Sequence, residues 1–115
     1  MGFVFAAAFP VLPGKADRVR NFAKELEPHQ AEWDRLCREG TFTRYTIVLQ
    51  STPGGDLLVQ SFEIDDPMKA RMTFTDSPYD RFWVSWIKDV TGMDLEAIPP
   101  DKRMPPPVVY DWKGK

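Results

Sequence analysis

At residues 41–64 the chain reads TFTRYTIVLQ, then STPGG, then DLLVQSFEI. Two runs rich in β-branched and aromatic residues flank a short segment that contains Pro53, Gly54 and Gly55. Proline and glycine in that place favour a tight turn between two antiparallel strands. The stretch therefore predicts a β-hairpin, with strands over residues 41–50 and 56–64.

The residues before the hairpin predict a strand and a helix. The run at residues 3–11 is apolar at successive positions, which is typical of a strand in the interior of a sheet. Residues 19–37 then repeat apolar side chains at helical spacing. This spacing continues past Pro28, so we expect a single helix with a kink at the proline, ended by Gly40.

The residues after the hairpin predict two helices and one more strand. A short helix is expected over Pro67–Phe74, and a longer one begins at Ser77-Pro78 and ends at Gly92. The run Val108–Tyr110 is the candidate for a last strand. The order strand, helix, strand, strand, helix, strand predicts an α+β fold of the ferredoxin-like βαββαβ type, a four-stranded antiparallel sheet with its helices on one face.

Composition limits the class of protein. The 115 residues are 43% hydrophobic and 28% charged, with a net charge of −2 and both signs interspersed. A basic stripe is missing, so we expect neither a nucleic acid nor a membrane as partner. The single cysteine, Cys37, rules out an intramolecular disulfide. We expect a cytoplasmic protein with one domain over residues 1–115, in which residues 94–107 form a proline-rich surface arm.

The strands also predict a partner. Residues 45–49 and 57–59 carry bulky apolar side chains at successive positions, so neither sheet face is purely polar. Helices on one face would leave an apolar surface on the other, and such a surface usually marks an interface. We therefore expect a homodimer in which two sheets pack face to face, with the arm from Met104 to Trp112 reaching the partner.

Short motifs at turns and helix starts carry a resemblance over nearly the whole chain. They are LPGK at residues 12–15, PGGD at 53–56, DDP at 65–67, SPYDRFW at 77–83 and TGMDL at 91–95. In them the chain resembles an uncharacterised bacterial family of the dimeric α/β barrel superfamily, the ferredoxin-like group that includes antibiotic-biosynthesis-type monooxygenases. That superfamily hosts oxygenases, haem-degrading enzymes, isomerases and ligand-binding proteins. The resemblance thus implies a dimeric fold and supplies no catalytic residue set.

Three polar residues on apolar elements are the candidate catalytic groups: His29, Arg44 and Glu63. His29 is the only histidine and would act as the acid/base, Arg44 would hold an anionic or enolate oxygen, and Glu63 would orient one of the other two. The alternatives are a histidine packed in the core beside Pro28, and a charged pair at the dimer interface or at a strand end. One histidine without clustered Asp, Glu or Cys supplies no metal site, and no cofactor is expected.

Aromatic residues are the candidate ligand-binding groups. Trp33, Tyr79 and Trp83 would wall a partly apolar cavity between the sheet and the helices, which suits a flat organic molecule. The alternative is that these side chains are core residues only. Two functions follow: a small-molecule-binding protein or cofactor-free enzyme of the oxygenase or isomerase kind, and a non-catalytic dimeric structural or regulatory module. A common pocket for His29, Arg44 and Glu63 would favour the first of these functions.

Overall fold

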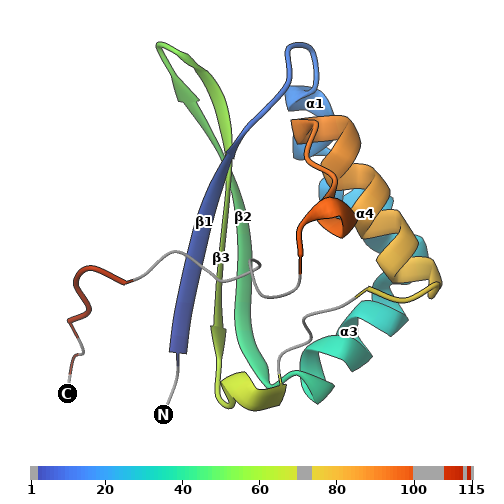
Figure 1. Cartoon of the computed structure of the whole chain (residues 1–115), viewed down its shortest axis with the longest axis vertical. Coiled ribbons are helices and arrows are strands. Elements are labelled where there is room, and N and C mark those ends of the chain that lie inside the picture. Colours follow the sequence, from blue (N-terminus) through green and yellow to red (C-terminus); the bar gives the residue numbers. More distant parts are fainter. Residues whose placement is uncertain (1–2, 70–73, 100–107, 113, 115) are drawn as a thin grey trace.

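The computed structural model describes residues 3–69, 74–99, 108–112 and 114 (Figure 1). Within these ranges the chain forms an α+β fold of three strands, four α-helices and three short 3-10 helices. In chain order these are β1 (Phe3–Pro10), α1 (Ala16–Arg20), α2 (Phe22–Leu26), η1 (Glu27–His29), α3 (Gln30–Glu39), β2 (Phe42–Thr52), β3 (Gly55–Ile64), η2 (Pro67–Lys69), α4 (Pro78–Thr91) and η3 (Leu95–Ala97).

The sheet is antiparallel, with strand order β1-β3-β2. The predicted hairpin is confirmed, because β2 and β3 pair along their whole length from Thr52↔Gly55 to Phe42↔Ile64. Gly55 has a φ of +127°, a backbone conformation that favours glycine, and this allows the chain to reverse there. A register shift between Phe42 and Arg44 marks a bulge at the far end of the ladder.

The prediction of a four-stranded ferredoxin-like sheet is wrong for the described residues, which form three strands. The expected fourth strand, Val108–Tyr110, has no strand conformation and pairs with no other strand. Its side chains are exposed, with Val109 at 96% and Tyr110 at 80% of full exposure. A run of three residues offers few ladder hydrogen bonds, and the prolines before it have no backbone N–H to extend one. Residues 100–107 of the predicted arm lie outside the described residues.

Two further expectations for the first half are corrected. The central strand is β3, whereas β1 lies at one edge of the described sheet. The single kinked helix is instead three short α-helices, separated at Asn21 and by the 3-10 turn η1 around Pro28. Pro28 lacks the N–H that an α-helix would use there, so the backbone tightens into a 3-10 turn before α3 begins.

Of the short helix expected at Pro67–Phe74, the described part is the 3-10 helix η2, and residues 70–73 lie outside the described residues.

Helix α4 has the predicted ends and anchors the core. Ser77 is its N-cap and accepts a hydrogen bond from the backbone N–H of Asp80, and Gly92 ends the helix in the left-handed conformation at φ +79°. The Asp80 carboxylate accepts hydrogen bonds from the N–H and the hydroxyl of Thr75, which holds the segment before the helix. The buried apolar residues of α4 in the main core cluster pack with Leu58 of β3 and with residues of α1 and α2: Tyr79, Trp83, Trp86, Ile87 and Val90.

All the helices lie on one side of the sheet (Figure 1). Every second side chain of the strands points toward the helices, and many of these are apolar, among them Leu49 and the fully buried Leu58. The residues between these point to the other face, because successive side chains in a strand alternate. Val48 is one of them and is 51% exposed. One sheet face is therefore core, and no described helix covers the other.

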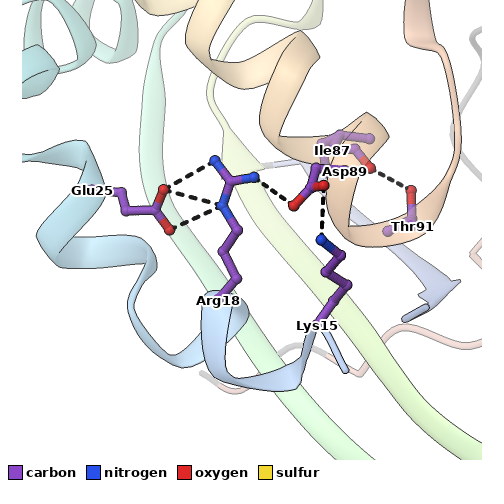
Figure 2. Close-up of polar contacts among 6 residues, drawn as sticks. All are labelled: Lys15, Arg18, Glu25, Ile87, Asp89 and Thr91. Carbon is purple, nitrogen blue, oxygen red and sulfur yellow. Dashed lines mark hydrogen bonds and ion pairs between the residues drawn. The ribbon is translucent and has the colours of Figure 1, made fainter. Parts of the chain in front are cut away.

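A network of ion pairs joins α1, α2 and α4 (Figure 2). Lys15 Nζ lies 2.9 Å from Asp89 Oδ1, Arg18 Nη1 donates to Asp89 Oδ2, and Arg18 Nη2 lies 3.1 Å from Glu25 Oε1. The hydrogen bonds from Lys15 and Arg18 lower the pKa of the Asp89 carboxyl. The bonds to Glu25 and Asp89 raise the pKa of the Arg18 guanidinium. Asp89 thus ties the end of α4 to the first helix and to the turn before it.

We expect Asp89→Asn to lower the free energy of unfolding at pH 7 by more than Asp17→Asn does. The Asp17 carboxylate pairs with Arg20 at a site where its side chain is 88% exposed, so it is the matched control. Because the pKa of Asp89 is lowered in the folded state, its contribution is full above about pH 4 and is lost as the pH falls through that lower pKa.

Urea denaturation of both variants and of the wild type at pH 7 and pH 2 measures these differences. The effect of Asp89→Asn should shrink at pH 2. Equal destabilisation by the two substitutions at pH 7 contradicts the assignment of Asp89 as the link between α1 and α4.

Candidate functional site

A cavity of about 160 Å³ lies between the sheet and helices α3 and α4. Ten described residues line it, and seven of them are aromatic. They come from α3 and its end, from β2 and β3, from α4 and from the segment before α4: Trp33, Leu36, Gly40, Phe42, Tyr45, Gln60, Phe62, Phe74, Tyr79 and Trp83. None of these side chains carries a charge at neutral pH, so the described wall combines aromatic and aliphatic surface with uncharged polar atoms.

The aromatic rings of the wall support one another. Trp33 stacks on Tyr79, with ring centroids 5.0 Å apart, and meets Tyr45 edge to face at 5.1 Å. Tyr45 in turn stacks on Phe62 at 5.5 Å and an interplanar angle of 6°. Such ring pairs add attraction beyond the area that they bury. Helices and strands are therefore joined across the cavity by a chain of rings, which gives it a firm wall of flat surfaces.

Glu32 positions two of these rings. Its Oε1 accepts a hydrogen bond of 3.1 Å from the backbone N–H of Tyr79, in the first turn of α4. A carboxylate is favoured there because the N-terminal N–H groups of a helix point outward and carry partial positive charge. The contact ties α3 to the start of α4, where Trp33 and Tyr79 stack.

The polar atoms of the wall belong chiefly to Tyr45 and Gln60. The Tyr45 hydroxyl donates a hydrogen bond of 2.7 Å to Gln60 Oε1. Burial raises the pKa of the Tyr45 hydroxyl above its ordinary value, so the group is a neutral donor at physiological pH. Gln60 stands in the central strand, opposite Ala7 on β1 and Ile47 on β2. It is a polar side chain between Leu58 and Phe62, its neighbours on the same face of β3.

The three predicted ligand-binding residues, Trp33, Tyr79 and Trp83, all line this cavity. Tyr79 and Trp83 are also buried members of the main core cluster, and Trp33 packs against it. Whether these rings hold a ligand stays a prediction.

The three predicted catalytic residues are not brought together. Tyr45 and Phe62 face the helices, so their chain neighbours Arg44 and Glu63 point to the opposite sheet face. There Arg44 and Glu63 stand directly opposite each other in the β2–β3 ladder, and both are exposed. His29 lies on the helix side, at the end of η1, where its ring stacks on Phe82 at 4.8 Å. The sheet separates His29 from the other two, and none of the three lines the cavity.

Gln60 and Tyr45 were not among the site residues predicted from the sequence. A signal for them was available in the alternation of the strand. Leu58, Gln60 and Phe62 share the more apolar face, and the residues between them share the more polar face. A polar residue on the apolar face of a strand is an exception of the kind that occurs at functional sites. The sequence alone does not say which of the two sets faces the helices.

Other reactive groups offer no second site among the described residues. Burial raises the pKa of the Cys37 thiol to about 11, so little nucleophilic thiolate forms at neutral pH. In the described part of the chain, no three His, Cys, Asp or Glu side chains gather closely enough to hold a metal ion. A search of the same residues for a helix with the length and hydrophobicity needed to span a membrane found none.

Comparisons with known proteins gave no match: no family model, curated protein or solved structure is significantly similar to this chain. The residues and geometry of the chain itself therefore carry the functional argument.

Proposed function

We propose that the protein binds a small, planar, uncharged organic molecule in the cavity between the sheet and helices α3 and α4. The observation that carries the proposal is the wall itself, in which seven of ten residues are aromatic and none is charged. Flat, firm, apolar walls with a few polar atoms are typical of small-molecule sites.

The size of the cavity supports a ligand of one ring. A cavity of about 150 Å³ lined by apolar side chains binds benzene in a well-studied engineered protein. The cavity here, at about 160 Å³, is of the same size and offers room for a single ring with a small substituent.

Binding is better supported than catalysis. An acid–base enzyme needs a group near the substrate that gains and loses a proton around neutral pH. His29, Arg44 and Glu63 do not line the cavity, and the raised pKa of Tyr45 keeps its hydroxyl protonated. The oxygenase and isomerase activities raised by the family resemblance therefore have no residue in this wall to carry them, and ligand binding is the function that we retain. The cytoplasmic location stays a prediction.

Matched probes test the proposal. We expect toluene to bind, and benzoate, which replaces the methyl group with a carboxylate, to bind at least tenfold more weakly, because a buried carboxylate needs a partner that this wall lacks. Leu36→Phe, which enlarges a wall residue, should weaken toluene binding by about tenfold. Leu12→Phe is the matched control, since Leu12 is 41% exposed and lies outside the wall.

Isothermal titration calorimetry of the wild type and both variants makes the measurement, and circular dichroism checks that each variant is folded. Toluene binding that Leu36→Phe leaves unchanged would place the ligand elsewhere. Absence of binding by the wild type up to the solubility limit of toluene overturns the proposal.

We also propose that a second copy of the chain covers the open sheet face. This face carries exposed apolar side chains, including Val4 and Val48, together with the opposite charges of Arg44 and Glu63. A two-fold axis that passes between Arg44 and Glu63 would bring each charge of one copy near the opposite charge of the other, and would make the face complementary to itself. In Figure 1 the exposed residues 108–112 lie on the side of the strands away from the helices, where a second copy would sit.

We expect multi-angle light scattering at micromolar concentration to give the mass of a dimer. Val48→Glu should produce the monomer, because it adds a like charge to each copy in the middle of the interface. Met68→Glu is the control, since Met68 is 89% exposed on η2 and lies outside the sheet. A monomeric wild type, or a dimer that survives Val48→Glu, contradicts this arrangement.

A further inference from the structure

Gln60 is a polar side chain within the apolar part of the covered sheet face. It stands on the central strand between Leu58, which is fully buried, and Phe62, which lines the cavity. An amide in such a place costs free energy unless its hydrogen-bonding groups are satisfied. Leucine or methionine would fill the same volume without that cost. The contacts of the amide must therefore offset this cost.

Tyr45 fixes the orientation of this amide. Its hydroxyl donates to Gln60 Oε1 at 2.7 Å, which occupies the acceptor end of the side chain. Burial holds the pKa of Tyr45 above its ordinary value, so the donated proton stays in place across the physiological range. The donor end of the amide, Nε2, is then the end left for another group.

The donor end is open. Gln60 Nε2 makes no hydrogen bond among the described residues, whereas Oε1 is paired. The side-chain atoms that are both fully enclosed and without a partner in the described part of the chain are Glu32 Oε2 and Trp86 Nε1, and Gln60 Nε2 is not one of them. It therefore keeps some exposed surface, and Gln60 is a wall residue of the cavity.

We propose that Gln60 determines which ligands the cavity accepts: planar, uncharged, single-ring molecules that carry a hydrogen-bond acceptor, such as an aromatic ketone or aldehyde. In the complex, Gln60 Nε2 donates to the ligand oxygen while the ring lies among Trp33, Tyr79 and Trp83. This inference rests on the proposed function, and it adds the chemical group that the ligand presents.

The same geometry discriminates against other classes. An apolar ligand of equal shape leaves the Nε2 donor unpaired, which costs the affinity of one hydrogen bond. A ligand whose only polar group is a donor meets the donor end of the amide and finds no acceptor there. An anion could accept the bond, but it would bury a charge against a wall whose described residues include no cationic side chain.

The test compares acetophenone with α-methylstyrene, in which a methylene group replaces the carbonyl oxygen at nearly the same shape. We expect wild-type protein to bind acetophenone about fivefold more tightly, the effect of one hydrogen bond between uncharged groups. Gln60→Leu should remove this preference and leave the affinity for α-methylstyrene within about twofold. Titration calorimetry gives both dissociation constants.

A second variant guards against loss of folding in Gln60→Leu. Tyr45→Phe keeps the amide and removes the hydroxyl that orients it, so the amide can turn either end toward the ligand. We expect the preference for acetophenone to fall in this variant as well. Gln50→Leu, on the open sheet face, is the control and should keep the wild-type preference.

The outcomes separate the two proposals. Binding of α-methylstyrene without any preference for acetophenone, or a preference that persists in both Gln60→Leu and Tyr45→Phe, overturns the role of Gln60 and leaves the cavity as a ligand site. Failure of both molecules to bind the wild type removes the proposed function together with the inference.

Discussion

Side chains of a strand point alternately to the two faces of a sheet, and in this protein helices cover only one of those faces. Every other feature depends on this constraint. It buries Leu58 and Ile64 completely, and Leu58 belongs to the same core cluster as the buried residues of α4. It also sends Arg44 and Glu63 to the uncovered face, one residue along the chain from two rings of the cavity wall. Chemistry that needs His29 and these two charges at one point is excluded by the sheet between them.

The cavity follows from what fills the covered face at that end of the sheet. Aromatic rings are large and rigid, and those of Trp33, Tyr45, Phe62 and Tyr79 rest against one another rather than collapse into the space between them. Gly40 contributes by having no side chain, since a Cβ there would lie 3.1 Å from the ring of Phe42. The result is a space of about 160 Å³ whose described wall residues are mostly aromatic, carry no charge and include the amide of Gln60. These properties suit recognition of a ligand better than transformation of one.

Local signals in the sequence were sufficient for part of this structure. The turn residues at 53–55 predicted the hairpin, and Ser77 and Gly92 predicted both ends of α4, because caps and turns act over a few neighbouring residues. The aromatic wall was also predicted at Trp33, Tyr79 and Trp83. The fourth strand was wrong, because pairing depends on distant partners that a short apolar run does not specify. The sequence also did not show to which sheet face Arg44 and Glu63 point. Both faces of these strands contain apolar residues, and only the position of the helices decides which face is covered.

The central claim is that a ligand enters the space between the sheet and helices α3 and α4. The indole N–H signals of the four tryptophans, observed by ¹H–¹⁵N NMR during titration with acetophenone, test it most directly. Trp33 and Trp83 line the cavity, whereas Trp112 is 74% exposed in the C-terminal segment and serves as an internal reference. The account predicts saturable shifts of the Trp33 and Trp83 signals while Trp112 stays in place. Shifts confined to Trp112, or no shift of any indole at saturating acetophenone, would contradict it.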